Sequence, residues 1–377
     1  MSLLKEIREI YRYFKTSKKV NAITFYSENG IYYQYYKGTI NILLTKKKTS
    51  ILYITSDIDD QIFKCNDENL SSFYINILVP FLFPFINTKM LIMTMPEIDK
   101  YHIKRSFNDV NHVYMFHSAN SIHMIYKKGA FDNYDTIFCI GQHHVDEIRK
   151  TEKLYNLKHK ELINVGYSWL EELEQLYLST KYNYKNVKGK IIIAPSWSKG
   201  NILDSCIHTI LETLMPLHYE IIVRPHPEYI KRNKDNVTLL SKKYCENQNV
   251  KVETQSSSIL NILESSLLIT DWSGIAIEFI WGMNKPVIYI NTPKKVENPE
   301  YKKLGIVAIE DQIRKLNENV INISDIVNID IMAKKLMRNK YSNNEETLNL
   351  KKETLFNWGR SSEVGAEYII NYLAKSK

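Results

Sequence analysis

Short apolar runs that alternate with helix-like segments are the feature that most constrains how this chain folds. Most of these runs are continuously apolar, as expected for parallel strands that are buried on both faces of a sheet. Segments with helical spacing of apolar residues lie between them, which predicts an α/β fold with parallel sheets. The runs expected to form strands are Ala22–Tyr26, Ile51–Thr55, Met90–Met95, His112–Phe116, Thr136–Ile140, Leu162–Val165, Lys190–Ala194, Tyr219–Val223, Asn249–Val252, Ser266–Thr270 and Pro286–Ile290.

The alternation starts again after a polar stretch, Thr180–Lys188, that has no apolar period and is typical of a linker. We therefore predict two Rossmann-like domains that face each other across a cleft, over residues 1–180 and 186–350. The remaining residues, 351–377, carry one apolar helical stripe at Glu363–Leu373. This stripe predicts a C-terminal helix that is suited to pack back on the first domain.

Composition and cysteine spacing exclude several classes of protein. Hydrophobic residues make up 44% of the 377 residues and charged residues 24%, which excludes a wholly disordered chain. The four cysteines form no CxxC pair, so no disulfide framework or zinc site is predicted. The longest apolar patch, Ile75–Ile86, holds two prolines and is about half as long as a membrane-spanning helix. Without a signal-peptide pattern, the expected location is the cytoplasm.

The net charge of +8 suits anionic partners, although a lysine-rich composition alone explains it equally well. Near the N-terminus, apolar residues share one helical stripe and lysines follow it. These residues are Leu3, Leu4, Ile7, Ile10, Tyr11 and Phe14, then Lys15, Lys18 and Lys19. The pattern is typical of a peripheral helix on an anionic membrane surface, here the inner face of the plasma membrane. The alternative is a helix packed on its own domain, and no nucleic-acid partner is predicted.

Polar side chains follow several predicted strands, at the end where open α/β sheets bind ligands. Ser196 and Trp197 follow one strand of the second half. Arg224-Pro225-His226-Pro227 follows another, and its prolines hold the two polar side chains on a stiff extended segment. A guanidinium can hold phosphate oxygens, and a histidine can donate a proton near neutral pH. The alternative is a turn with a structural histidine.

Another strand end, Thr270-Asp271-Trp272-Ser273-Gly274, is followed by a helical pattern that continues to Met283. A helix that begins after Ser-Gly presents backbone N–H groups at the positive end of its dipole, which suits a phosphate or a diphosphate. The alternative is ordinary capping of this helix by Asp271 or Ser273.

His117 follows a predicted strand of the first half, in a region with several other histidines. Taken alone, it is compatible with a structural role as well as a functional one. A metal site at His143-His144 is disfavoured, because adjacent residues on a helix face different ways and no carboxylate has a suitable spacing. No acidic DxD motif follows a strand, so the sequence predicts chemistry without a metal or a cofactor.

Seven segments, in this order along the chain, together form a recognisable pattern. They are Phe116-His117-Ser118, Tyr134-Asp135 with Gly141, Gly166-Tyr167, Ala194-Pro195-Ser196-Trp197, Arg224-Pro225-His226-Pro227, Leu268–Gly274 and Lys285–Tyr289. The pattern resembles the CDP-glycerol glycerophosphotransferase family, the teichoic-acid and capsule primases and polymerases of the glycosyltransferase-B fold. It covers roughly half of the chain.

This resemblance implies an enzyme that moves a glycerol-phosphate or related polyol-phosphate unit from a CDP-linked donor to a hydroxyl of a polymer or lipid-linked acceptor. It implies that His117 is the catalytic base and that His226, with Arg224, stabilises the diphosphate. In such a transfer, positioning and electrostatics dominate over covalent chemistry. The donor-binding residues predicted on the second domain are Arg224, Ser196, Trp197, Asp271, Ser273, Gly274 and Glu278.

The chain departs from the family's usual pattern at three places. Ser118 stands where the family usually has Gly, Trp272-Ser273-Gly274 stands for Tyr-Ser-Ser, and Glu278 stands where an Asp is usual. The last two changes lie where the donor's diphosphate is expected. The alternatives are a sugar transferase of the same fold that makes capsule or lipopolysaccharide from a nucleotide sugar, a nucleotide-sugar epimerase, and a non-catalytic polymer-binding protein.

Overall fold

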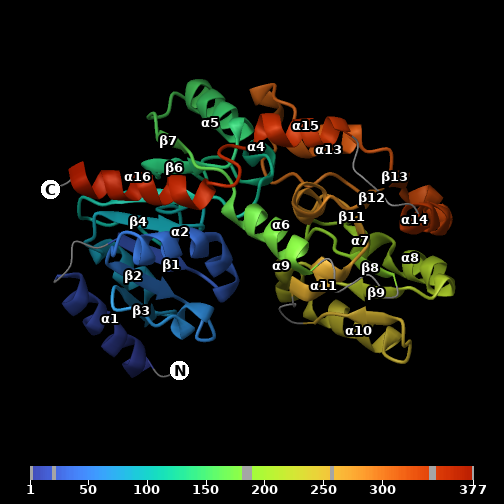
Figure 1. Cartoon of the computed structure of the whole chain (residues 1–377), viewed down its shortest axis with the longest axis horizontal. Helices are drawn as coiled ribbons and strands as arrows, with labels where there is room; N and C mark the ends of the chain where they lie inside the picture. Colours follow the sequence, from blue (N-terminus) through green and yellow to red (C-terminus); the bar gives the residue numbers. More distant parts are fainter. Residues whose placement is uncertain (1–2, 19–22, 181–188, 255–258, 339–344, 376–377) are drawn as a thin grey trace. The chain divides into compact units, whose positions relative to one another are not determined.

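The computed structural model describes residues 3–18, 23–180, 189–254, 259–338 and 345–375. It has an α/β architecture with two parallel sheets (Figure 1). The chain divides into two compact units, each with its own sheet. Unit 1 comprises Met1–Ala119, Tyr126–Trp169 and Thr354–Lys377, and unit 2 comprises Asn120–Ile125 and Leu170–Glu353.

The sheet of unit 1 has the strand order β3-β2-β1-β4-β5-β6-β7, and neighbouring strands pair in parallel. The strands are β1 (Ile23–Ser27), β2 (Ile51–Thr55), β3 (Leu70–Tyr74), β4 (Met90–Met93), β5 (Asn111–Met115), β6 (Thr136–Cys139) and β7 (Glu161–Asn164). The helices of this unit are α1 (Leu3–Ser17), α2 (Tyr33–Thr45), α3 (Val79–Leu82), α5 (Gln142–Tyr155) and α16 (Ser361–Lys375).

Helices α2 and α16 pack together in the core of unit 1. Tyr36 and Ile40 of α2 lie in one buried cluster with Ala366 and Ile369 of α16. The two helices approach closely at Gly38, where an added Cβ would lie 2.1 Å from Ser362 Oγ. Glycine at this position therefore allows α16 to pack against α2.

The sheet of unit 2 has the order β10-β9-β8-β11-β12-β13, again with parallel neighbours. Its strands are β8 (Lys190–Ile193), β9 (Glu220–Val223), β10 (Val250–Val252), β11 (Leu267–Thr270), β12 (Val287–Asn291) and β13 (Val320–Asn322). Its helices are α4 (Ile122–Ile125), α7 (Ile202–Ser205), α8 (Ile207–Leu214), α9 (Pro227–Arg232), α10 (Lys234–Tyr244), α11 (Ile259–Glu264), α12 (Ile275–Ile277), α13 (Ile309–Leu316) and α14 (Ile329–Arg338). Two further helices, α6 (Ser168–Thr180) and α15 (Glu345–Thr354), have most of their residues in unit 2.

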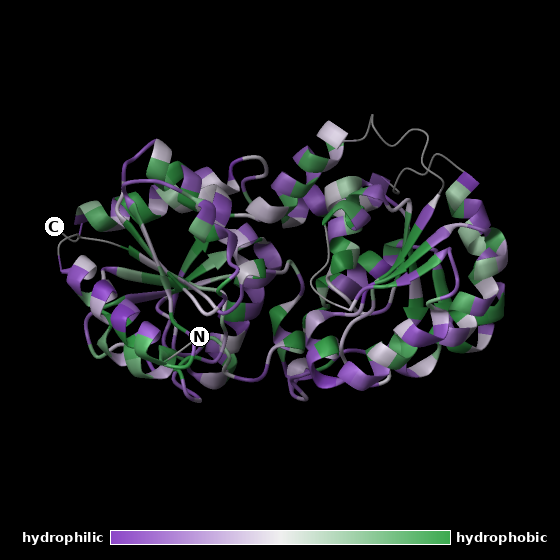
Figure 2. Ribbon diagram, turned by 90° about the horizontal axis from the view of Figure 1, so that it is seen from below, coloured by the Kyte–Doolittle hydropathy of each residue, from purple (hydrophilic) through white to green (hydrophobic). Residues whose placement is uncertain are grey.

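Hydrophobic strands form the centre of each unit, and the helices that cover them turn hydrophilic residues outward (Figure 2). In unit 2 the buried cluster joins Ile191 and Ile193 of β8 with Ile210 of α8, Leu240 of α10 and Ala333 of α14. Burial of strands on both faces explains why their sequences are continuously apolar.

The α/β fold with two parallel sheets, predicted from the alternation, is confirmed. The sequence analysis missed two strands, β3 and β13, and both lie at an edge of their sheet. An edge strand is less enclosed, so β3 keeps the polar pair Ser71-Ser72 and β13 spans only three residues. Most of the linker predicted at Thr180–Lys188 lies outside the described residues.

Two helical segments of unit 2 are interrupted. The segment Ile202–Met215 divides at Cys206, whose φ of −149° is not helical, and so forms α7 and α8. The segment Ile275–Met283 begins as α12 and continues as a single π-helical turn, Glu278–Gly282. Such turns are frequent at functional sites. No helix in the described ranges is both long enough and apolar enough to cross a membrane.

Candidate active site

Three neighbouring strands of unit 2 bring most of the predicted donor residues to one edge of the sheet. Strands β9, β8 and β11 are adjacent, and all run in the same direction. Arg224 and His226 follow β9, Ser196 and Trp197 follow β8, and Asp271 follows β11. Because carboxyl ends of parallel strands share one edge, these residues gather where open α/β sheets bind ligands.

Asp271 ties two of these loops together. The residue is 1% exposed, and its carboxylate accepts hydrogen bonds from the backbone N–H groups of Ser196 (2.7 Å), Trp272 (2.6 Å) and Ile202 (3.2 Å). Its backbone carbonyl accepts a further bond from Arg314 Nη1 at 2.8 Å. The carboxylate therefore orders the loop after β8 and the start of α7, which makes Asp271 a positioning residue for the predicted donor site.

Arg224 is held by a buried ion pair. Its Nε and Nη2 lie 2.6 and 3.2 Å from the two carboxylate oxygens of Glu253, and Asn261 donates a further bond of 2.6 Å to the same carboxylate. The Arg224 and Glu253 side chains are 12% and 8% exposed. This bidentate geometry fixes the guanidinium at the end of β9. The predicted contact of Arg224 with phosphate oxygens stays a prediction.

His226 caps the first turn of α9. Its Nδ1 accepts a hydrogen bond from the backbone N–H of Glu228 at 3.1 Å, so the neutral ring carries its proton on Nε2. The backbone of His226 is extended, with φ −60° and ψ 142°, as the following Pro227 predicts. The cap thus orients the imidazole, and the N–H donor of the neutral ring is at Nε2.

Two cations lie over the indole of Trp197, and sequence reasoning missed both. The Arg232 guanidinium is 4.4 Å and Lys295 Nζ 4.6 Å from the ring centroid, with the His226 ring 6.4 Å away. Burial lowers the pKa of Lys295 from its usual value. Two cations thus lie beside the loop after β8.

Trp272 has a similar environment. Arg314 lies 4.1 Å and Lys294 5.3 Å from the centroid of its ring, and the indole N–H donates to the carbonyl of Thr292 at 3.0 Å. Lys294 is also paired with Asp311. The only sequence signal for these cations was the pair Lys294-Lys295 shortly after a strand. Arg232 and Arg314 come from segments that the sequence pattern did not connect to the site.

The helix predicted as an anion site begins directly after Gly274. Gly274 is the N-cap of α12, and the N–H of Ile277 bonds to its carbonyl at 3.0 Å. Ser273 precedes this start, and Glu278 begins the π-helical turn at its other end. The Asp271 carboxylate accepts hydrogen bonds from the backbone N–H groups of Ser196, Trp272 and Ile202, and none of these residues belongs to α12.

His117 lies in unit 1, two residues beyond β5, in an aromatic environment. Its ring centroid is 5.3 Å from that of Tyr32 and 5.9 Å from that of Tyr35. Tyr35 in turn stacks on Tyr167, and the Tyr167 hydroxyl donates to the carbonyl of His117 at 3.0 Å. The tyrosine-rich stretch Tyr32–Tyr36 is a visible signal that the sequence analysis did not use.

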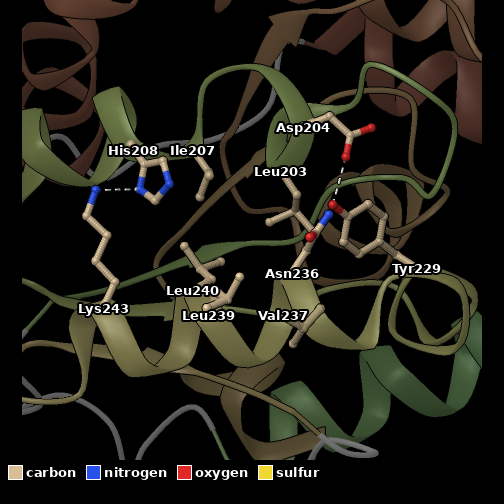
Figure 3. A pocket seen from close by; sticks show the side chains of 10 residues that line it. All are labelled: Leu203, Asp204, Ile207, His208, Tyr229, Asn236, Val237, Leu239, Leu240 and Lys243. Atoms are coloured by element: carbon tan, nitrogen blue, oxygen red, sulfur yellow. Dashed lines mark hydrogen bonds between the residues drawn. The ribbon is translucent and has the colours of Figure 1, made fainter.

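A separate pocket lies on unit 2, between α7–α8 and α9–α10 (Figure 3). Apolar side chains such as Leu203 and Leu240 line it, and none of the predicted site residues does. On its wall, the Tyr229 hydroxyl donates to Asp204 at 2.7 Å, as Figure 3 shows. Burial and the nearby Asp204 raise the pKa of Tyr229 to about 12. This bond ties α9, which His226 caps, to α7.

Among the residues that the structure describes, no three His, Cys, Asp or Glu side chains gather in a way that could hold a metal ion.

Comparisons with known proteins bear on the family and the fold. The model of the CDP-Glycerol:Poly(glycerophosphate) glycerophosphotransferase family matches residues 128–296. This range includes His226 and the segment Asp271–Gly274, but not His117. No curated protein matches the chain.

Several solved structures share the fold. The wall teichoic acid polymerase TagF, in a crystal soaked with CDPG, has a TM-score of 0.63 and 13% identity, covering 100% of this chain and 99% of the other. Staphylococcus aureus MnaA with UDP has a TM-score of 0.56 and 11% identity, covering 94% and 97%. UDP-GlcNAc 2-epimerase from Methanocaldococcus jannaschii has a TM-score of 0.56 and 12% identity, covering 94% and 99%. The resemblance to the CDP-glycerol glycerophosphotransferase family is thereby confirmed: residues 128–296 match the model of this transferase family, and the chain has the glycosyltransferase-B fold that it shares with TagF.

Proposed function

We propose that this enzyme transfers a glycerol-phosphate or related polyol-phosphate unit from a CDP-linked donor to a hydroxyl of a cell-surface polymer or a lipid-linked acceptor. The observation that carries the proposal is the composition of the loops that follow the strands of unit 2. The family match covers these loops, and they combine His226, a helix start and several cations. Such a combination suits a diphosphate.

The donor's diphosphate would lie between the loop after β8 and the start of α12. Lys295 and Arg232, both beside Trp197, supply positive charge there. Ser273 and Gly274 supply backbone N–H groups at the helix start, and Asp271 orders the loops. Ser196, Trp197, Glu278 and Arg224 complete the predicted donor set.

In the proposed reaction, the acceptor oxygen attacks the β-phosphorus of the donor. A new P–O bond forms, the bond between the β-phosphorus and the bridging oxygen breaks, and CMP leaves with the electron pair. His117 takes the proton of the acceptor hydroxyl. His226, whose neutral ring carries its proton on Nε2, stabilises the charge that develops on the phosphate oxygens of the departing CMP. The protein's part is mainly positioning and electrostatics.

A sugar transferase that uses a nucleotide sugar is the second candidate. The fold is shared with nucleotide-sugar enzymes, and Trp272-Ser273-Gly274 departs from the family's usual sequence at the diphosphate position. The family match favours the polyol-phosphate donor.

A finer part of the proposal is that the enzyme works at an anionic membrane surface on the cytoplasmic side. Helix α1 is attached to its unit through buried Glu6 and Tyr13, whereas its apolar residues Leu4 and Tyr11 are each 70% exposed. This arrangement favours the membrane explanation over a helix whose apolar stripe packs on its own domain.

The neighbouring surface supports the same proposal. The Glu6 carboxylate accepts hydrogen bonds from the backbone N–H groups of Asn76 and Leu78 (3.1 and 3.0 Å). The start of α1 is therefore close to the segment that contains Ile77, which is also exposed. Exposed aromatic rings, among them Phe81, follow in the same segment.

Product analysis with purified protein tests the proposed activity. CDP-glycerol, CDP-ribitol and common UDP- and CMP-sugars would be supplied in turn with a polyol-phosphate acceptor, and products would be followed by phosphorus NMR. We expect a new phosphodiester and free CMP with a CDP-polyol. Transfer of a sugar would instead support the second candidate, and epimerisation would refute both.

A further inference from the structure

Two adjacent histidines at the start of α5 hold the loop that carries His117. We propose that His143, supported by His144, is a positioning residue that fixes this loop for transfer. The inference rests on the proposed function, because it assumes that His117 is the base. It concerns the pair for which the sequence analysis considered, and disfavoured, a metal site.

His143 holds the loop on the C-terminal side of His117. Its ring is buried, and Nε2 lies 2.9 Å from the carbonyl oxygen of Ala119. A carbonyl can only accept, so the proton of this hydrogen bond is on Nε2. The backbone two residues after His117 is thus fixed by a side chain from another element.

His144 contacts the loop on the N-terminal side of His117. Its ring is fully buried, and its centroid is 4.0 Å from that of Phe116. The Nδ1 atom accepts a hydrogen bond from the backbone N–H of Ile140 at 3.4 Å, and the ring lies 4.1 Å from that of His143. His144 therefore supports both Phe116 and the ring of His143.

The start of α5 is itself firmly anchored, which a positioning role requires. Gly141, its N-cap, forms a bridge to Leu355, and the N–H of Phe356 donates to the carbonyl of Ile140 at 3.0 Å. A Cβ at Gly141 would lie 2.3 Å from the carbonyl oxygen of Thr354 and 3.0 Å from His143 Nδ1. Only glycine permits this close packing, so the two histidines project from a backbone with little room to move.

Three contacts thus hold the segment 116–119: the Phe116 ring on His144, the His117 carbonyl on the Tyr167 hydroxyl, and the Ala119 carbonyl on His143. A displacement of about 1 Å in a reacting group costs roughly 100-fold in rate. Loss of the hydrogen bond to Ala119 should therefore lower kcat, because His117 would be displaced. Donor affinity should not change, because the predicted donor residues belong to other segments.

A matched pair of amide variants tests this role. In His143→Gln the amide nitrogen reaches the position of Nε2 and can still donate to Ala119, whereas in His143→Asn it reaches only the position of Nδ1. We expect His143→Gln to keep transfer within about threefold of wild type and His143→Asn to lose about tenfold or more in kcat. Donor affinity, measured by calorimetry with CDP-glycerol, should stay unchanged in both. His102→Gln, at an exposed histidine of the same unit, is the control.

Combining His143→Asn with His117→Ala separates the positioning role of His143 from the proposed role of His117 as the base. If His143 acts through His117, His143→Asn should cause no further loss of transfer in the His117→Ala background. Equal kcat values for His143→Gln and His143→Asn, or full additivity with His117→Ala, would overturn the positioning role while leaving the proposed function intact. Near-normal transfer by His117→Ala alone would instead refute the proposed base.

Discussion

Replacing Asp271 by Asn perturbs the residue that orders the predicted donor site while keeping the shape of its side chain. The carboxylate accepts from Ser196 and Trp272 through Oδ1 and from Ile202 through Oδ2. If the amide oxygen keeps the two Oδ1 bonds, the new NH₂ group faces the Ile202 N–H. One hydrogen bond to a charged acceptor is lost, and buried donors are left unsatisfied. Together these effects should destabilise the loop by about 2–4 kcal/mol.

Hydrogen–deuterium exchange measures this loss locally, independently of how the two units unfold. A loss of 2–4 kcal/mol corresponds to exchange that is about 30- to 900-fold faster in peptides that cover Ser196 and Ile202, if these amides exchange by local opening. Asp235→Asn, at an exposed position in the first turn of α10, is the matched control and should leave exchange unchanged. Unchanged protection in Asp271→Asn would refute the conclusion that this carboxylate orders the loop.

Three further predictions follow from charge and exposure. Lys295→Gln should weaken CDP-glycerol binding about tenfold or more in calorimetry, because a cation beside Trp197 is lost; equal affinity would remove Lys295 from the donor site. Burial opposes ionisation of Asp135, but hydrogen bonds from His112 and the ion pair with Arg105 lower its pKa to about 2. Its contribution to stability is thus present above about pH 4 and is lost as the pH falls towards 2, so acid melts of Asp135→Asn should show a weaker pH dependence in this window. Leu4→Glu should reduce co-sedimentation with anionic vesicles without changing the melting temperature, and binding that does not depend on anionic lipid would contradict the membrane proposal.

The sequence predicted the central strands well because their burial on both faces leaves a continuous apolar signal. The missed edge strand β3, with Ser71-Ser72, carries no such signal. The strand ends gave the positions of His226 and Asp271, since topology alone places them at one edge of the sheet. Their partners were not predictable in this way. Glu253 pairs with Arg224 from the end of a different strand.

The same limit applies to the cations and histidines around the site. Arg232 reaches Trp197 from α9, and His143 reaches Ala119 from α5. These contacts depend on how side chains pack between elements, and hydrophobic periodicity does not encode that packing. A single sequence therefore predicts where a site lies better than which charges surround it.

The most direct test of the account measures transfer rate and donor affinity together for His117→Ala and His226→Ala. We expect His117→Ala to lose transfer by about 10²–10⁴-fold while it still binds CDP-glycerol, because a general base acts on the rate and not on the donor. His226→Ala should lower the rate and also weaken donor binding, because its Nε2–H is proposed to contact the diphosphate. Near-normal transfer by His117→Ala, or unchanged donor affinity and rate in His226→Ala, would contradict the proposed mechanism.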